Sequence, residues 1–196
     1  MVARERNTRK RAWHWRRIKK IVQSRLRFLN EAGAKTILTR LYARALGGMR
    51  TTESVPRNYG QSTSMIATLG VGGVEAPMLI EGSVDTLVFN AYCEEVLQPT
   101  LKRGDIIVLD NLGAPRASRI EEITAHCRAQ VLWLPPYSPD FSPIELMWSK
   151  VKAYLKKVKA RTQEQLEAAI AEALQTITVS DCLNWFRHCG YRVTSN

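Results

Sequence analysis

The order of apolar and polar positions along the chain predicts strands first and helices last. Residues 26–29 alternate apolar and basic side chains and run into the polar stretch Asn30 to Gly33, which predicts a first strand ending in a turn. Further strands are expected at about residues 62–69 and 74–80, and the glycine-rich residues 70–73 join them. The later two segments therefore predict a β-hairpin.

The middle of the chain alternates helical and strand patterns. Asp85 is placed to cap a helix whose apolar positions share one face until residues 102–104. Residues 105–110, Asp-Ile-Ile-Val-Leu-Asp, form an apolar run closed by an acid, which is typical of a central strand buried on both faces. A second helix is expected at residues 116–127 and a further strand at residues 131–134.

The last third of the chain is expected to be helical after an irregular loop. Residues 135–143 contain too many prolines for regular structure. Helical periodicity follows from Pro143 to about Lys159, from Thr162 to about Ile177, and near Asp181 to His188. This order of strands and helices predicts one mixed α/β domain.

The composition excludes several classes of protein. The chain has 196 residues, of which 45% are hydrophobic and 24% charged, so it is not wholly disordered and can bury one sizeable core. It lacks both a long apolar run and the apolar stretch of a secretory signal, so we expect a cytoplasmic protein with no membrane segment. The spacing of Cys93, Cys127, Cys182 and Cys189 indicates neither a zinc site nor a disulfide scaffold.

The net charge of +11 is concentrated at the N-terminus. Residues 1–27 hold eleven Lys or Arg against one acid, whereas the rest of the chain holds 18 basic and 17 acidic residues. We therefore expect a basic arm or linker over residues 1–25, followed by a nearly neutral domain over residues 26–196. Such an arm suits a polyanion, because each cation that meets a phosphate releases counterions. The candidate DNA-binding residues of the arm are Arg9, Lys10, Arg11, Arg16, Arg17, Lys19 and Lys20.

The arm also has a simpler interpretation, as a solvated helix or tail with no dedicated partner. Trp13 and Trp15 lie among its charges. We expect these two indoles to dock the arm on the core, although stacking on nucleic-acid bases would also use them.

Two acids occupy positions where open α/β sheets form sites. Asp110 closes the most apolar strand, and Glu145 lies in the first turn of the helix after the proline-rich loop. Glu145 has a structural alternative, because Ser142-Pro143-Ile144-Glu145 also fits a capping box in which the carboxylate holds the Ser142 amide. Asp110 with Asn111 is likewise a common turn-forming pair.

Longer blocks of sequence surround both acids. They are Ile107-Val-Leu-Asp-Asn111 and Leu134-Pro-Pro-Tyr-Ser-Pro-Asp-Phe-Ser-Pro-Ile-Glu145, with 34 residues between the two acids. These blocks resemble the mariner-related bacterial insertion-sequence transposases of the DDE superfamily, the insertion-sequence six-thirty group. Similar blocks are Phe28-Leu-Asn-Glu-Ala-Gly33, Thr39-Arg-Leu-Tyr-Ala-Arg44 and Asn184-Trp-Phe-Arg-His-Cys-Gly-Tyr191, so the resemblance covers roughly residues 26–191.

The resemblance implies a ribonuclease-H-like fold in which three carboxylates hold two Mg²⁺ or Mn²⁺ ions for cutting and joining DNA. Hard divalent cations prefer carboxylate oxygens, and two ions can stabilise the attacking and leaving oxygens together. By position, Asp110 is the second carboxylate and Glu145 the third, and Asn30 stands where the family has the first. Because an amide brings no charge, we expect a weakened two-metal site.

These assignments carry a geometric expectation. Asn30, Asp110 and Glu145 should converge if the first and fourth strands are adjacent and the Glu145 helix packs over their ends. Glu31 should point to the opposite face, because consecutive strand residues alternate. Lysines continue along the Glu145 side of its helix, where they would follow a DNA backbone or form an ordinary solvated face: Lys152, Lys156 and Lys159.

The leading hypothesis is a transposase catalytic domain whose activity is impaired by Asn30. An inactive DNA-binding remnant that inhibits active copies is the alternative, and a nucleic-acid-binding module that only shares the fold is a weaker one. The expected partner is double-stranded DNA at transposon ends and targets. Because the arm is too short for a helix-turn-helix region, we also expect a separately encoded recognition half, and a homodimer is compatible with the sequence.

Overall fold

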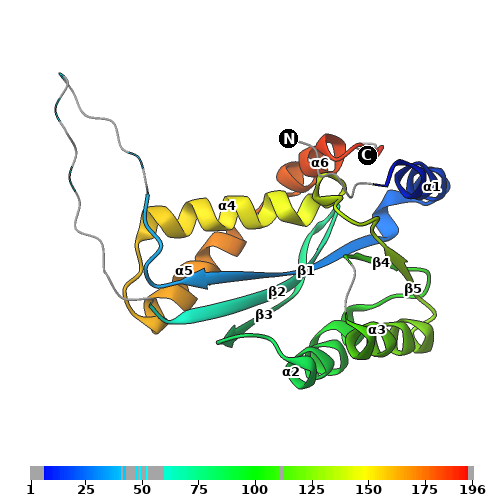
Figure 1. The fold of residues 1–196 in the computed structure, drawn as a ribbon, viewed down its shortest axis with the longest axis horizontal. Helices are drawn as coiled ribbons and strands as arrows, with labels where there is room; N and C mark the ends of the chain where they lie inside the picture. The colour runs from blue at the N-terminus through cyan, green and yellow to red at the C-terminus, as the bar shows by residue number, and fades with distance from the viewer. Residues whose placement is uncertain are drawn as a thin grey trace.

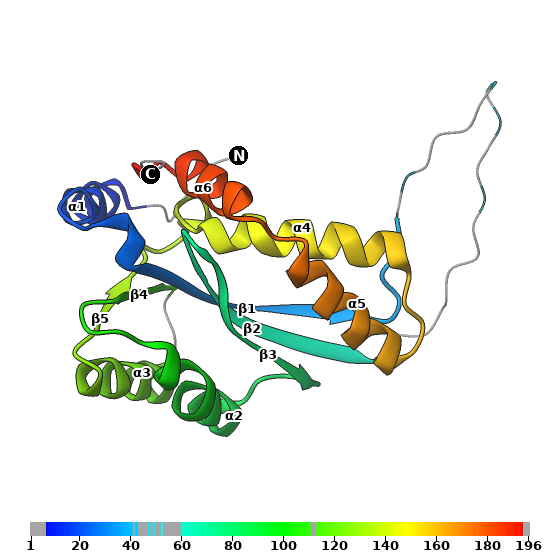
Figure 2. The ribbon, with the colours of Figure 1, turned by 180° about the vertical axis from the view of Figure 1, so that it is seen from behind.

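The computed structural model describes residues 7–40, 60–110 and 113–193, together with positions 42, 47, 49 and 52. A five-stranded mixed sheet lies at its centre in the order β3-β2-β1-β4-β5, with helices on both faces (Figures 1 and 2). β1 pairs antiparallel with β2 and parallel with β4, so it joins the hairpin to the parallel half of the sheet. The strands are β1 (Leu26–Lys35), β2 (Ser62–Gly70), β3 (Gly73–Glu81), β4 (Ile106–Leu109) and β5 (Gln130–Trp133).

The two faces of the sheet are covered by different helices. Alternation along β1 sends Phe28 into one core and Leu29 into the other. Trp148 is central to the first core and Ile120 to the second. The first face is covered by α4 (Pro143–Val158), α5 (Gln163–Gln175) and α6 (Val179–His188), and the second by α2 (Thr86–Ala91) and α3 (Ala114–His126).

The expected elements of the middle segment form, with one irregularity. Asp85 caps α2 by accepting a hydrogen bond from the Val88 amide at 2.8 Å. The chain then continues as a π-helical turn, η3 (Tyr92–Leu97), and a 3-10 turn, η4 (Gln98–Thr100), rather than as one regular helix. The Tyr92 hydroxyl donates to the Ala76 carbonyl, which fixes this irregular segment on β3.

The expectation that the first strand ends in a polar turn at Asn30 to Gly33 is wrong. β1 continues to Lys35, because every residue from Asn30 onward finds a partner in β2, from Asn30 opposite Ala67 to Lys35 opposite Ser62. Ala32 and Ala34 are buried beneath the helices. Residues 30–33, which suggest a turn in sequence, are strand residues here because they pair with β2.

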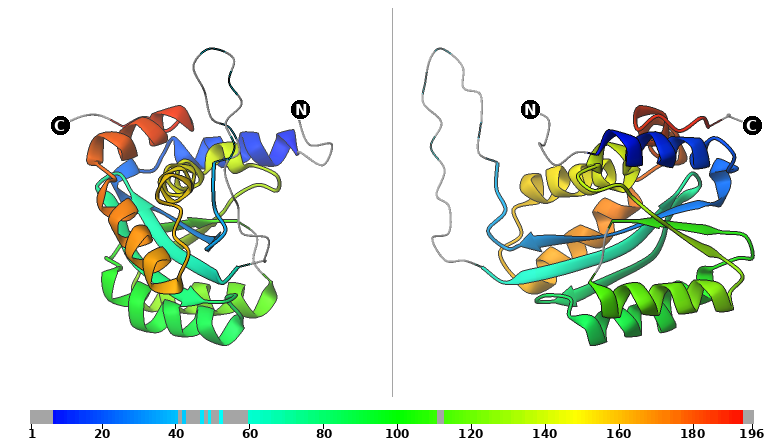
Figure 3. Two further views of the ribbon diagram at one scale, coloured as in Figure 1. Left: turned by 90° about the vertical axis from the view of Figure 1, so that its left-hand side faces the viewer. Right: turned by 45° about the vertical axis from the view of Figure 1, so that its right-hand side comes forward.

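The basic N-terminal region contains the helix α1 (Thr8–Ile18), which packs beside the loop leading into α4 (Figure 3). The Trp15 ring lies 4.8 Å from the Phe141 ring and 5.3 Å from the Tyr191 ring, measured between centroids. His14 and Ile18 are buried on the same side of the helix. Trp15 therefore docks α1 on the core as expected, whereas Trp13 remains 53% exposed.

Some expectations concern residues outside the described part of the chain. These are Asn111 and half of the block from Thr39 to Arg44, namely positions 41, 43 and 44. The four cysteine thiols are unpaired. Among the described residues, no helix has both the length and the apolar character needed to cross a membrane.

Candidate active site

Asn30, Asp110 and Glu145 line one small hollow of about 50 Å³. The last pair of the parallel register is Phe28 with Val108; Asn30 lies two residues further along β1, and Asp110 follows immediately after the end of β4. Helix α4 packs against β1 and carries Glu145 in its first turn. The three residues converge as expected, although Asn30 lies within β1 rather than at its end.

The Asn30 side chain connects the sheet to α4. Its Nδ2 donates a hydrogen bond to Glu145 Oε1 at 2.8 Å, and its Oδ1 accepts one from the Glu31 amide at 2.8 Å. The capping-box alternative for Glu145 is not formed, because the Ser142 amide donates instead to the Pro139 carbonyl at 3.0 Å. The Glu145 carboxylate is therefore directed to the site and not to its own helix end.

Glu31 lies on the opposite face of β1, as the alternation of the strand requires. Its Oε2 is 3.8 Å from Nη1 of Arg116, which follows Asp110 at the start of α3. Burial raises the pKa of Glu31, and the Arg116 charge offsets part of that rise. A second hollow of about 60 Å³ is lined by Glu31, Arg116 and Asp110 among others, so Asp110 borders both hollows.

The loop before α4 is held by Arg11 of α1. Arg11 Nη1 donates to Ser138 Oγ at 2.7 Å and to Asp140 Oδ1 at 3.0 Å, while Nη2 donates to Asp140 Oδ2 at 2.5 Å. Its guanidinium lies 3.7 Å from the centroid of the Phe141 ring. Asp140 therefore pairs with a distant helix. Sequence reasoning missed this pair, because Arg11 resembles every other cation of the basic region.

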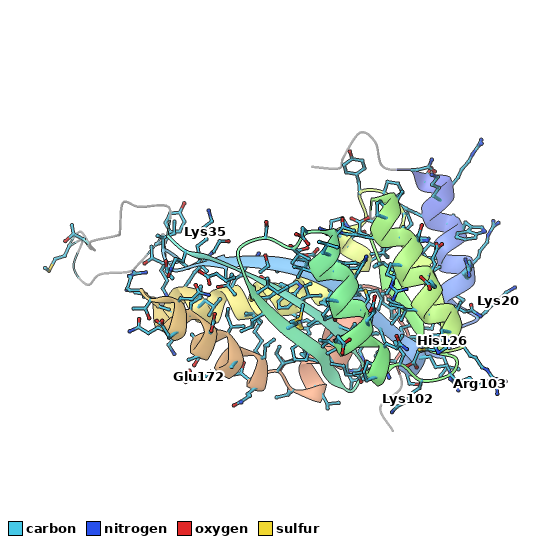
Figure 4. The ribbon with its side chains drawn as sticks, turned by 90° about the horizontal axis from the view of Figure 1, so that it is seen from below. Lys20, Lys35, Lys102, Arg103, His126 and Glu172 are labelled. Carbon is cyan, nitrogen blue, oxygen red and sulfur yellow. The ribbon has the colours of Figure 1, made fainter. Side chains whose placement is uncertain are left out.

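The remaining candidate DNA-binding cations lie in two groups. Lys152 and Lys156 are half-buried on α4, and Lys159 follows this helix as its C-cap with a left-handed φ of 59°, off the helical line. The exposed cations of α1 and of the turn after it are Arg9, Lys10, Arg16, Arg17, Lys19 and Lys20. Figure 4 shows Lys20 at the same end of the molecule as Lys102 and Arg103.

The donor atoms of the hollow fit one divalent cation better than two. Asp110 and Glu145 supply carboxylate oxygens, which hard cations such as Mg²⁺ prefer. The described residues contain no cluster of three or more His, Cys, Asp or Glu that could hold a metal ion. Asn30 stands at the third position, and its N–H group faces Glu145, so its oxygen reaches a cation only after the amide turns.

Comparison with known sequences gives two matches. The family described as DDE superfamily endonuclease matches residues 25–167. The Tcb1 transposable-element transposase of Caenorhabditis briggsae is 28% identical over 105 residues, which is 52% of this chain and 38% of that protein. The aligned region thus spans well under half of this relative.

Comparison with solved structures confirms the fold. A pre-cleavage Mos1 transpososome superposes with a TM-score of 0.72 at 15% identity, covering 96% of this chain and 61% of that chain. The catalytic domain of Mos1 mariner transposase gives a TM-score of 0.65 at 14% identity and covers 96% and 91%. The sheet and its flanking helices are therefore ribonuclease-H-like. Since the family match covers well over half of the chain, including Asn30, Asp110 and Glu145, this protein belongs to the DDE superfamily endonucleases.

Proposed function

We propose that this chain is the catalytic domain of a DNA transposase of the insertion-sequence six-thirty group, which cuts and joins DNA strands at transposon ends. One observation carries the proposal: Asp110, Glu145 and Asn30, which are far apart in sequence, share one hollow between the sheet and α4. The family and the similarity to Tcb1 and Mos1 transposases support it.

The residues of the hollow suit phosphodiester chemistry. A Mg²⁺ or Mn²⁺ ion held by Asp110 and Glu145 would polarise a phosphate oxygen and acidify a bound water. Solved Mos1 paired-end complexes contain Mn or Mg, which supports this choice of cation. In this chain the β1 and β4 register positions Asp110, and the Asn30 hydrogen bond orients the Glu145 carboxylate.

We infer that Asn30 impairs this activity. With Asn30 in place of an acid, two carboxylates face the four positive charges of a two-metal site. A unit charge about 4 Å from a cation contributes on the order of 4 kcal/mol at an effective dielectric constant of 20, so its loss is enough to weaken one cation severely. We therefore expect this chain to bind the second cation weakly or not at all.

A second candidate function is an inactive transposase remnant that occupies DNA ends. The Asn30 hydrogen bond favours it, because a proton donor fills the Glu145 oxygen that a cation would otherwise use. Both functions need double-stranded DNA in the bacterial cytoplasm, held by the exposed cations of α1 and by Lys152 and Lys156. A separately encoded helix-turn-helix chain and a homodimer belong to the same proposal.

Plasmid nicking in Mn²⁺ tests the proposal. Three forms are compared: the chain itself, Asn30→Asp, and Asn30→Asp with Asp110→Ala. We expect Asn30→Asp to raise nicking at least tenfold and Asp110→Ala to abolish that gain. Glu31→Gln in the Asn30→Asp background is the matched control, because Glu31 faces Arg116, and it should retain most of the activity.

Two other results of this assay would contradict the expectation. Equal nicking by the chain and its Asn30→Asp form would show that another acid acts as the first ligand. DNA binding without nicking by any form would favour the inactive remnant.

A further inference from the structure

A larger cavity opens beside the carboxylate hollow, between α1 and the end of β5. Its volume is about 590 Å³, within the usual range of ligand pockets, whereas the carboxylate hollow holds about 50 Å³. Trp13 from α1 and Trp133 from β5 line it, and Pro135 and Pro136 extend its apolar wall. Leu134 lines both cavities, so they are neighbours.

The two indoles of this cavity are held in place. The Arg17 guanidinium lies 4.9 Å from the centroid of the Trp13 ring, and Trp133 Nε1 donates to Glu121 Oε1 at 3.1 Å. Trp13 nevertheless remains 53% exposed, although α1 is otherwise firmly docked through Trp15. An oriented aromatic ring left open to solvent provides a stacking surface with little conformational entropy to lose.

The charges at the cavity match a nucleic acid. Arg9 and Lys10 line it, and none of its described lining residues is acidic. Cations beside aromatic rings are the combination with which proteins hold single strands, since the bases stack and the phosphates meet the cations. Inside a duplex both faces of a base are stacked on its neighbours, so an interior base must leave the duplex stack before it can lie on Trp13.

We propose that this cavity binds an unpaired DNA nucleotide, in the strand whose neighbouring phosphate reaches the Asp110 and Glu145 hollow. Leu134 connects the two sites, because its amide is bonded to the Leu109 carbonyl immediately before Asp110. Placing the phosphate at the hollow rests on the proposed function. Binding of the unpaired nucleotide does not, because it needs the indoles and cations but no metal.

Two DNA probes test the cavity directly, in EDTA. One is a blunt duplex, and the other is the same duplex with a short single-stranded extension that carries 2-aminopurine at the junction. Fluorescence anisotropy of the full chain should show about tenfold tighter binding of the extended duplex, since base–aromatic stacking gives roughly that factor or more. The 2-aminopurine emission should fall on binding as the base stacks.

Substitution of Trp13 separates the cavity from general DNA affinity. Trp13→Ala should remove the tenfold preference and the 2-aminopurine quenching while blunt-duplex affinity changes less than twofold, and Trp13→Phe should keep most of the preference. Tyr42→Ala is the control, because Tyr42 is an aromatic side chain that is 89% exposed and outside the cavity lining. Thermal melting confirms that the variants fold.

Two results would overturn the cavity assignment: equal binding of both probes by the unsubstituted chain, or an unchanged preference in Trp13→Ala. The nicking assay reports separately on the proposed function. If Trp13→Ala abolishes the preference while Asn30→Asp fails to nick, the nucleotide cavity stands and the catalytic proposal fails.

Discussion

The Asn30 amide donates a hydrogen bond to Glu145 Oε1 at 2.8 Å, between the middle of β1 and the first turn of α4. An amide and a carboxylate can lie this close without any cation. Two carboxylates at the same separation repel each other unless a cation lies between them. We therefore expect the residue at position 30 to decide whether the contact between β1 and α4 at the hollow is stable by itself or depends on metal.

Asn30→Asp should lower stability in EDTA and make it respond to Mn²⁺. Because Glu145 is exposed, loss of its hydrogen bond from Asn30 should cost roughly 0.5–1.5 kcal/mol, and carboxylate repulsion adds to it. Millimolar Mn²⁺ should reverse this loss in Asn30→Asp and have little effect on the unsubstituted chain. Denaturant unfolding with and without Mn²⁺ measures both effects.

Asn30→Ala is the control for this comparison, because it removes the hydrogen bond and adds no charge. It should be destabilised without any gain from Mn²⁺. If Asn30→Asp is as stable as the parent chain in EDTA, the hydrogen bond to Glu145 contributes nothing and the coupling to metal is absent.

Arg11 should act on stability rather than on DNA affinity. Its side chain is only 11% exposed and makes a bidentate pair with Asp140, which is itself half exposed. A double-mutant cycle of Arg11→Ala and Asp140→Ala should give a coupling energy of about 1 kcal/mol, near the upper end for partly exposed pairs. Arg11→Lys should recover little of it, since an ammonium cannot form the fork.

The matched control is Arg16→Ala, which removes an exposed cation of the same helix. This substitution should change the free energy of unfolding by no more than about 0.5 kcal/mol. A coupling energy of zero between Arg11 and Asp140 would mean that this ion pair contributes nothing and that the packing of His14, Trp15 and Ile18 holds α1 in place.

The hydrophobic pattern of the chain predicts the elements that carry Asp110 and Glu145 better than it predicts the extent of β1. The apolar run before Asp110 and the helical stripe beside Glu145 each follow from one segment, and both elements form as expected. The extent of β1 does not follow from one segment, because Asn30 to Lys35 become a strand only through pairing with β2. The turn preference of residues 30–33 is outweighed by their pairing with β2 residues more than thirty positions away.

The many cations of α1 make its packing against the core hard to predict from sequence. Every third or fourth residue of this helix faces inward, from Arg11 through His14 and Trp15 to Ile18, but the surrounding cations mask that stripe in the sequence. The cavity between Trp13 and Trp133 was equally hidden, since it needs two elements more than a hundred residues apart. Deleting residues 1–27 would therefore remove core contacts together with charge.

Lys152 and Lys156 should contribute to DNA binding without regard to sequence. Replacing either one by Ala should weaken binding of unrelated duplexes equally and reduce the slope of log affinity against log salt by about 1. Lys150→Ala is the control on the same helix, because Lys150 pairs with Asp181 at 2.7 Å and should affect only stability. An unchanged salt slope in both variants would identify this face as ordinary solvated surface.

His14 should make the fold sensitive to acid. Its ring is buried and stacks on Phe141 with 5.4 Å between centroids, and neither ring nitrogen has a hydrogen-bond partner. Burial, together with the charges of Arg17 and Arg11, lowers the pKa of His14 from 6.5 to about 4. The unfolded chain therefore binds more protons between these values, so stability is complete above pH 6.5 and falls as the pH drops towards 4.

At about 1.4 kcal/mol for each pKa unit, His14 should account for a loss of about 3 kcal/mol between pH 7 and pH 4. Urea unfolding at a series of pH values measures the loss, and His14→Phe isolates it, because phenylalanine keeps the stacking on Phe141 and cannot be protonated. Carboxylates also titrate near pH 4, but they are shared by both proteins and cancel in the difference. Parallel stability curves for the two proteins would mean that His14 is hydrated and titrates normally. A curve for His14→Phe that stays flatter between pH 6.5 and 4 would place the acid sensitivity in the contact between α1 and Phe141.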